Sequence, residues 1–226
     1  MNDAHPAISI ISAIPYFADL DRDTLQAIAQ QSVRQHHATR QVIFVEGEPC
    51  MGLYFIQTGW LKVVKVSAQG REQILRFVGP GESLNELGVL SGSPNPATAI
   101  ALEPVDLWVV PRAALFRLID EHPGLARAMI VALAHRTQYL LGLVEDLSLH
   151  TVEARLARFL LQESVDGVLP RRRWATQTEI AARLGTVLDV LSRALRGLAD
   201  ENLIRIERTR IEILDREGLE TKAAHE

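Results

Sequence analysis

Four polar side chains share one face of a predicted helix near the end of the chain. They are Asp189, Ser192, Arg193 and Arg196. Spacings of three and four residues place them on neighbouring helical turns. An arginine here can donate two hydrogen bonds to O6 and N7 of guanine, and a carboxylate can accept one from N4 of cytosine. This pattern predicts a surface that contacts base edges in DNA, although Asp189 could instead complete a capping box.

The residues around this face predict a helix-turn-helix. Thr176 is followed three positions later by Glu179, which is the capping-box pattern of a helix start. Gly185 ends that short helix, and Thr186 is predicted to cap a second one. The buried stripe of the second helix is predicted to be Val190, Leu191, Ala194, Leu195 and Leu198. A short helix, a turn with glycine and a longer helix are the parts of this motif.

Segments on either side add candidate contacts to the DNA backbone. Gln177 and Thr178 begin the first helix, where exposed backbone N–H groups favour phosphate. Residues 204–213 alternate apolar and charged side chains and predict a hairpin, or wing, with Arg208 and Arg210 at its turn. Residues 171–173 are three arginines, which could contact DNA or form a solvated strand edge. The predicted DNA-binding residues are Gln177, Thr178, Thr186, Leu188, Asp189, Ser192, Arg193, Arg196, Arg208 and Arg210.

The charge distribution is compatible with this reading, although the net charge of −4 is unfavourable for DNA binding. Residues 151–226 hold 13 basic and 13 acidic side chains, whereas residues 1–150 hold 11 and 15. A neutral domain can bind DNA if its basic residues lie on one face.

Composition and motifs exclude several other classes of protein. An apolar content of 47% is typical of a globular protein with a substantial core. We find no secretion signal, and charged residues interrupt the longest apolar stretch, so we expect a cytoplasmic protein. Cys50 is the only cysteine, which excludes an internal disulfide and fits a reducing compartment. No catalytic triad, phosphate-binding loop or metal-ligand spacing is present, so neither catalysis nor a metal site is expected.

The N-terminal half predicts a β-roll. A short helix is expected at residues 19–31, and Gly- or Pro-containing turns then separate many short apolar runs, which is typical of an antiparallel sandwich or roll. The predicted strands cover residues 42–45, 53–56, 60–66, 73–78, 98–101 and 107–110.

A long helix is predicted to begin at Pro123 and to pair with a second copy of the chain. Its heptad seam comprises Met129, Leu133, Arg136, Leu140, Leu143 and Leu147. The alternative is that this stripe packs on its own domain. The predicted organisation is a β-roll domain with an N-terminal helix at residues 1–115, a dimerisation helix and hinge at 116–150, and a winged helix-turn-helix at 151–226, which together make an α+β protein.

The chain resembles the CRP/FNR superfamily of bacterial transcription regulators from about Ile14 to Leu219. The resemblance rests on the order and glycine spacing of residues 42–49, 54–56 with Gly59, 79–82 and 86–90. It implies a cyclic-nucleotide-binding-type jelly roll, a dimer that binds an inverted repeat, and RNA polymerase as a partner. Asp189, Ser192 and Arg193 occupy places where FNR and the nitric-oxide-responsive DNR proteins carry Glu, Ser and Arg, so the chain resembles that side more closely.

The same resemblance implies an effector pocket in the roll. Its predicted residues are Gly81, Glu82, Glu86, Leu87, Gly88, Pro96, Ala97, Thr98, Leu140 and Leu141. Glu86 matches the carboxylate that binds a ribose hydroxyl, but Pro96 stands where the family has its phosphate-binding arginine. Burying a phosphate without a counter-charge is costly, so cyclic AMP is disfavoured and an apolar pocket is expected.

The identity of the effector stays open at this point. A single cysteine argues against an FNR-type iron–sulfur cluster. Haem that reports nitric oxide or carbon monoxide is one alternative, with His36, His37, His122, His135 and His150 as candidate axial ligands. A small apolar or aromatic acid, a redox role for Cys50 and a ligand-independent regulator are the others. A cyclic-nucleotide-binding module without regulatory function is a different class of protein, and Pro96 disfavours it.

Overall fold

A computed structural model describes residues 5–170, 172 and 174–224 of the chain. The chain separates into two compact units. The first comprises Met1–Lys65 and Leu75–Tyr139, and the second comprises Val66–Ile74 and Leu140–Glu226. Each unit has its own hydrophobic core, and each is described separately below.

Two four-stranded sheets make the roll. The strands are β1 (Val33–His37), β2 (Val42–Phe44), β3 (Gly52–Thr58), β4 (Leu61–Val66), β5 (Glu72–Val78), β6 (Ser83–Leu84), β7 (Thr98–Ala101) and β8 (Val105–Pro111). Their orders are β1-β8-β3-β6 and β2-β7-β4-β5. The strands predicted from the sequence match β2, β3, β4, β5, β7 and β8 to within a few residues, so that prediction is confirmed.

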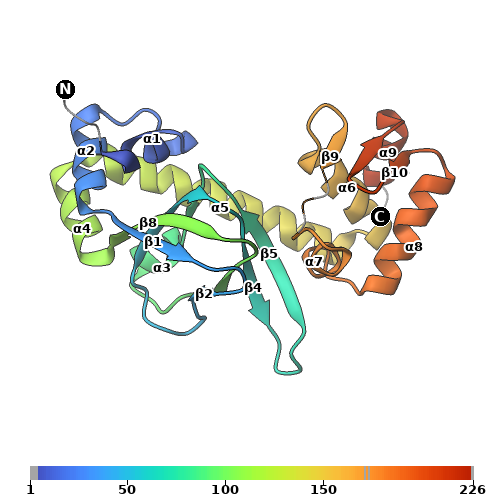
Figure 1. Ribbon diagram of the computed structural model, residues 1–226, viewed down its shortest axis with the longest axis horizontal. Coiled ribbons are helices and arrows are strands. Elements are labelled where there is room, and N and C mark those ends of the chain that lie inside the picture. The colour runs from blue at the N-terminus through green and yellow to red at the C-terminus, as the bar shows by residue number, and fades with distance from the viewer. Residues whose placement is uncertain (1–4, 171, 173, 225–226) are drawn as a thin grey trace. The chain divides into compact units, whose positions relative to one another are not determined.

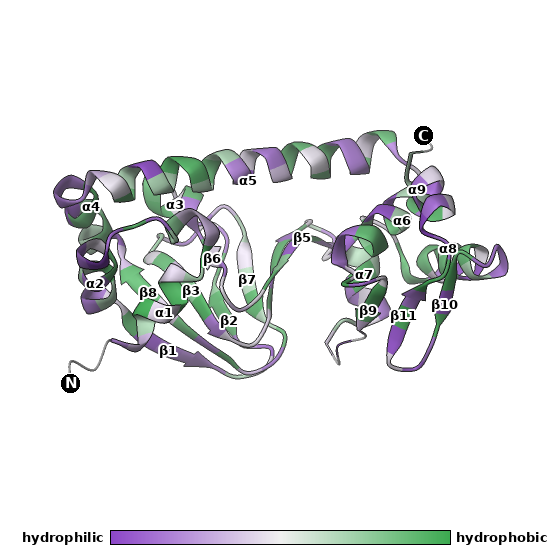
Figure 2. Ribbon diagram, turned by 90° about the horizontal axis from the view of Figure 1, so that it is seen from above, coloured by the Kyte–Doolittle hydropathy of each residue, from purple (hydrophilic) through white to green (hydrophobic). Residues whose placement is uncertain are grey.

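Strand β3 separates two apolar clusters of the first unit. Successive side chains point to opposite faces of a strand. Leu53 and Phe55 therefore enter a cluster shared with helices, while Tyr54 and Ile56 enter the cluster between the sheets. Figure 2 shows the apolar colour of β3 and β8 and the polar colour of β1, at the edge of the same sheet.

Helices cover the outer side of this sheet and complete its core. They are α1 (Pro6–Ser12), the 3₁₀ helix η1 (Pro15–Phe17), α2 (Arg22–Gln31) and α4 (Arg112–Glu121), and Figure 1 shows α1, α2 and α4 close together. Phe17 packs edge-on against Phe55, with 5.7 Å between the ring centroids. The predicted helix at residues 19–31 is confirmed as α2, which begins later because the Asp21 carboxylate accepts a hydrogen bond from Thr24 N as its N-cap.

Helix α5 (Pro123–Leu149) is the predicted long helix and supplies residues to both units. The predicted seam is wrong at two positions, because Met129 is 1% exposed and Leu143 is 6% exposed within their own chain. The apolar residues that α5 leaves in solvent include Ile130, Leu141 and Val144, each at least 60% exposed. Met129 belongs to the core that α1, α2 and α4 build. The exposed apolar residues of α5 begin at Ile130, one position after Met129.

The second unit is a small helical domain with a three-stranded sheet of order β10-β11-β9. Its elements are α6 (Val152–Glu163), β9 (Val168–Pro170), α7 (Gln177–Arg183), α8 (Leu188–Asp200), β10 (Ile204–Ile206), β11 (Arg210–Ile213) and α9 (Arg216–Ala224). Leu156, Leu191, Leu195 and Leu219 are fully buried or nearly so and join its helices. The predicted α+β class with a β-roll, a long helix and a winged helix-turn-helix is confirmed.

Candidate DNA-binding surface and effector site

The turn between α7 and α8 forms as its sequence predicts. Thr176 Oγ1 accepts a hydrogen bond from Glu179 N at 3.2 Å and caps α7. Gly185 then has φ +66°, a left-handed conformation that favours glycine. A Cβ atom on Gly185 would lie 2.6 Å from Leu147 Cδ2, so the Leu147 side chain would have to shift to admit a larger residue.

The start of α8 differs from the prediction. Val187 is its N-cap and no side chain caps the helix, so the roles expected for Thr186 and Asp189 in a capping box are wrong. The backbone explains this result, because Thr186 N instead donates to Ala181 O at 2.9 Å and closes the turn. The Asp189 carboxylate is left exposed in the first turn of α8, where it is free to contact a ligand.

The outer face of α8 carries exposed side chains of several kinds. Leu188 is 43% exposed, and Asp189, Arg193 and Arg196 are exposed too. Arg196 Nε donates to Ser192 O at 3.2 Å, which holds that guanidinium close to the helix. Within the described part of the chain, Asp189 and Arg193 have no side-chain partner. They therefore have their full hydrogen-bonding capacity available to a ligand.

The two helices of the motif meet at Gln177 and Ser192. Ser192 Oγ donates to Gln177 Oε1 at 3.5 Å, which links the first turn of α7 to the middle of α8. Thr178 lies beside Gln177 and is exposed. The structure therefore brings together the residues predicted to contact phosphate and those predicted to contact bases.

The arginines of the wing differ in whether an acidic side chain pairs with them. Arg210 lies in β11, not in the turn, and its Nε is 2.9 Å from Glu207 Oε2. Arg205 pairs in the same way with Glu212 at 3.1 Å. Arg208 is exposed at the turn, and no described residue pairs with it. Of the arginine run upstream, Arg172 is exposed, while residues 171 and 173 lie outside the described residues.

In the first unit, Glu86 is the centre of a buried polar cluster. It begins α3 (Glu86–Ser91) and is 6% exposed. Its Oε1 accepts hydrogen bonds from the hydroxyls of Ser83 and Tyr16, the latter at 3.2 Å, and these two hydroxyls also share a hydrogen bond. Burial and the nearby Glu86 carboxylate raise the pKa of Tyr16 far above its usual value, so Tyr16 remains a neutral donor.

Two arginines place positive charge near this cluster, and whether the effector pocket is apolar stays a prediction. Arg76, on β5, donates from Nη2 to Ser83 O, and its Nη1 is 3.9 Å from Glu82 Oε1. Burial, and next the nearby Arg76, lower the pKa of Arg136, on α5, to about 10, while Glu86 and Glu82 oppose this shift. Arg76 and the hydroxyl partners of Glu86 were not among the predicted site residues, and Arg136 was predicted only as part of the dimer seam. Glu86 and its hydroxyl partners come from separate elements, so no local sequence pattern indicates that they meet.

The other predicted pocket residues have different environments. Gly81 and Glu82 are half-buried, Leu87 is 48% exposed, and Pro96 is exposed. Gly88 and Ala97 are buried, and a Cβ on Gly88 would lie 2.6 Å from Asn85 Oδ1. Thr98 Oγ1 accepts a hydrogen bond from Glu46 N at 3.0 Å. Leu140 and Leu141 belong to the other unit, so their part in a pocket stays a prediction.

Two of these residues bear on the expectation that a cyclic nucleotide is disfavoured, which stays a prediction. Oε1 of Glu86, the group expected to bind a ribose hydroxyl, already accepts from Ser83 and Tyr16. Pro96 offers neither a charge nor a backbone N–H to a phosphate.

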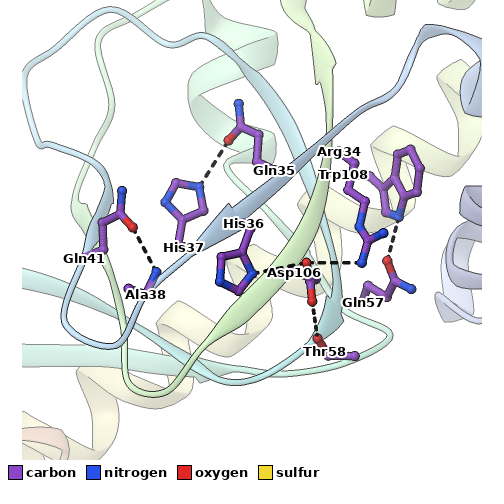
Figure 3. Close-up of polar contacts among 10 residues, drawn as sticks. All are labelled: Arg34, Gln35, His36, His37, Ala38, Gln41, Gln57, Thr58, Asp106 and Trp108. Carbon is purple, nitrogen blue, oxygen red and sulfur yellow. Dashed lines mark hydrogen bonds and ion pairs between the residues drawn. The ribbon is translucent and has the colours of Figure 1, made fainter.

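The candidate haem ligands are dispersed over the structure. His36 Nδ1 lies 3.3 Å from Asp106 Oδ1, and Figure 3 shows that Arg34 and Thr58 contact the same carboxylate. His37 Nε2 lies 3.2 Å from Gln35 Oε1. His122 contacts Thr24 and His150 contacts Glu145, whereas His135 is exposed. Burial raises the pKa of Cys50, which disfavours a reactive thiolate.

Two further features are absent among the described residues. No group of three or more His, Cys, Asp or Glu among them is arranged to hold a metal ion. None of their helices is long and apolar enough to cross a membrane.

Comparison with known proteins gives the family. Residues 34–122 match the cyclic nucleotide-binding domain, and residues 154–222 match the Crp-like helix-turn-helix domain. The chain belongs to the CRP/FNR family of transcription regulators. This CRP/FNR regulator is thus a DNA-binding protein with an effector-binding domain.

Whole-length similarities agree with this assignment. A CRP-like cAMP-activated global transcriptional regulator of Mycobacterium tuberculosis is 27% identical over 220 residues, which cover 95% of this chain and 98% of that protein. FixK2 from Bradyrhizobium japonicum has the same fold, with a TM-score of 0.78 at 24% identity over 86% of this chain and 98% of that one. A CRP-family transcriptional regulator from Thermus thermophilus gives a TM-score of 0.65 at 27% identity, over 84% and 96%. The relatives from Mycobacterium tuberculosis and Thermus thermophilus are both described as transcriptional regulators.

Proposed function

We propose that this CRP/FNR regulator binds an inverted repeat in DNA as a homodimer, with one copy of α8 in the major groove of each half-site. The observation that carries the proposal is the exposed face of α8, where Asp189 and Arg193 lie on adjacent turns without a protein partner among the described residues. A guanidinium and a carboxylate one turn apart can recognise guanine and cytosine respectively. The Glu, Ser and Arg of FNR-type helices correspond to Asp189, Ser192 and Arg193, so we expect an FNR-like site that differs where the shorter Asp189 reaches.

Dimerisation is proposed to occur through α5, along a row one residue beyond the predicted seam. The row runs through Ile130, Ala134, Thr137, Leu141 and Val144, at spacings of four and three. Ile130, Leu141 and Val144 are 67%, 65% and 60% exposed, a large apolar surface to leave in water. Apolar residues at this spacing are typical of paired helices, so a second copy of α5 is the proposed occupant.

We propose that an effector in the β-roll changes the affinity of the dimer for DNA. The relatives do not fix which effector, because one is described as cAMP-activated and another, from Xanthomonas campestris, as c-di-GMP-responsive. The surroundings of Glu86 disfavour a cyclic nucleotide seated at Pro96. A haem-dependent gas sensor and a ligand-independent regulator are the alternatives, and an absorption spectrum separates them, because bound haem gives a Soret band. RNA polymerase is the proposed partner on DNA, in the cytoplasm.

Selection of binding sites from a random duplex pool tests the proposal. The full-length protein is expected to enrich an inverted repeat whose half-site centres are about 10 base pairs apart, one helical turn of DNA. Sedimentation of the complex should give two chains per duplex. Enrichment of single, unrepeated sites, or of no sequence at all, would contradict the dimeric recognition proposed here.

A further inference from the structure

A cavity of about 470 Å³ lies within the second unit, where α6, α9 and the end of α8 pack together. Pockets that hold small molecules typically have volumes of about 300–1,000 Å³. The buried side chains of Ala154 and Leu203 form apolar parts of its wall. The described residues that line this cavity include none of those predicted to contact DNA and none from the β-roll. It is therefore separate from both sites considered above.

Three charged side chains meet at the cavity. Lys222 Nζ, on α9, lies 2.8 Å from Glu153 Oε1 on α6 and 2.7 Å from Glu201 Oε1 at the end of α8. Hydrogen bonds to Glu153, and next to Glu201, raise the pKa of Lys222, so its ammonium keeps its charge at neutral pH. Two carboxylates and one ammonium give the described lining an excess of one negative charge.

The two carboxylates have acceptor capacity left. Each uses Oε1 for Lys222, and no hydrogen bond from a described residue reaches Oε2 of Glu153 or of Glu201. The hydroxyls of Thr151 and Thr221 already bond to backbone groups. An added anion would lie beside two carboxylates, which repel it, whereas an added ammonium could donate to both remaining oxygens. The charges of the lining therefore favour a cation.

We propose that this cavity binds a small organic cation, in which an ammonium group is attached to an apolar body. The ammonium lies between Oε2 of Glu153 and Oε2 of Glu201, and the apolar body packs on Ala154 and Leu203. Thr151 is both the N-cap of α6 and part of the lining, so the ligand also contacts the beginning of that helix. The proposal depends neither on the effector of the β-roll nor on dimerisation.

Three probes of nearly equal size and different charge test the assignment. They are 2-phenylethylammonium, which is positive, 2-phenylethanol, which is neutral, and 3-phenylpropionate, which is negative. Each is titrated into the full-length protein without DNA at constant ionic strength, and ligand-observed NMR gives the dissociation constant. The ammonium is expected to bind about five-fold more tightly than the alcohol, and the carboxylate more weakly than either. The ammonium should also raise the melting temperature the most.

Substitutions locate the bound ammonium. The side chains of Glu153 and Glu201 are 38% and 49% exposed, so solvent screens their charges in part. Glu153→Gln and Glu201→Gln should each weaken ammonium binding about two- to five-fold and leave binding of the alcohol unchanged. Thr221→Phe places a ring at the cavity wall and should weaken both probes. Glu220→Gln removes an exposed carboxylate of α9 that pairs with Arg216 and does not line the cavity, and this matched control should bind as the wild type does.

Several results would overturn the proposal. It is wrong if the three probes bind alike, if none of them binds, or if both glutamine variants bind the ammonium as tightly as the wild type. Equal weakening by Glu220→Gln would show attraction to the acidic protein as a whole and would also exclude this site. Circular dichroism verifies that each variant is folded. The glutamine variants keep the shape of the original side chains, so they test the site even if Thr221→Phe does not fold.

Discussion

Replacing Arg193 by alanine should weaken DNA binding while leaving the fold unchanged. The Arg193 side chain is exposed on α8 and has no partner in the part of the chain that the structure describes. Surface substitutions of this kind usually change the free energy of unfolding by no more than about 0.5 kcal/mol. The melting temperature of Arg193→Ala should therefore stay close to that of the wild type.

The expected loss of binding follows from the geometry of a bidentate contact. One arginine that donates two hydrogen bonds to guanine contributes about 1–3 kcal/mol of discrimination. This corresponds to a change in dissociation constant of about 5- to 150-fold for one half-site. A homodimer loses the contact twice, and well-separated contacts add approximately, so the full site should suffer about twice the free-energy loss.

Fluorescence anisotropy with two duplexes measures this effect. One duplex carries the selected inverted repeat, and the other has a single base pair changed in each half-site. Arg193→Ala should bind both with similar affinity, whereas the wild type should prefer the first. Arg216→Ala, which removes an exposed arginine of α9 that pairs with Glu220, is the matched control and should behave as the wild type. The reasoning is refuted if Arg193→Ala still distinguishes the duplexes, or if Arg216→Ala loses the same discrimination.

Five other substitutions test four separate parts of the structure. Arg208→Ala should reduce the salt dependence of DNA binding by about one counterion per chain. Arg210→Ala should reduce it by less, because Glu207 already neutralises Arg210. DNA titrations at several salt concentrations will show whether the effect of Arg208→Ala is the larger one. Leu141→Asp should shift the sedimenting species from dimer to monomer, and a persistent dimer would contradict the proposed α5 row. Phe55→Ala should lower the free energy of unfolding by about 3–5 kcal/mol in urea, since Phe55 is fully buried against Phe17; a loss below about 1 kcal/mol would contradict that packing. Burial, and next the nearby His36, hold the pKa of His37 below 6.5 in the folded state, so the unfolded chain binds the proton more readily and the free energy of unfolding falls as the pH drops below about 6.5. His37→Asn should flatten this fall in urea titrations. An unchanged pH profile would refute the assignment.

The DNA-binding half was predictable because its signals are local. The cap at Thr176, the glycine at 185 and the apolar stripe of α8 each depend on neighbours within a few residues. The exception is the start of α8, where Thr186 has the residue type of a cap but uses its N–H to close the turn at Ala181. Which of two adjacent residues caps a helix depends on the turn geometry, which a sequence pattern does not contain.

The sensing half was predictable in outline but not in its site. Strand β1 was missed because its sequence, Val33 followed by Arg, Gln and two His, lacks an apolar alternation. The heptad pattern on α5 correctly indicated an apolar helix, but both Met129 and Ile130 fit such a pattern, and only packing in three dimensions decides which is buried. Tyr16, Ser83 and Glu86 come from three separate elements and are joined by hydrogen bonds only in the folded chain, so no local sequence pattern indicated this buried polar cluster.

The hydrogen bond from Tyr16 to Glu86 has a practical consequence for dissecting the protein. The match to the cyclic nucleotide-binding domain begins at residue 34, so a fragment cut at that boundary would look complete by homology. Such a fragment would lack both the Tyr16 hydroxyl and Phe17, which packs on Phe55. Screening for ligands with it would sample a Glu86 that has lost one of its two donors. Ligand screening should therefore use a chain that keeps the N-terminal helices, with any purification tag at the other end.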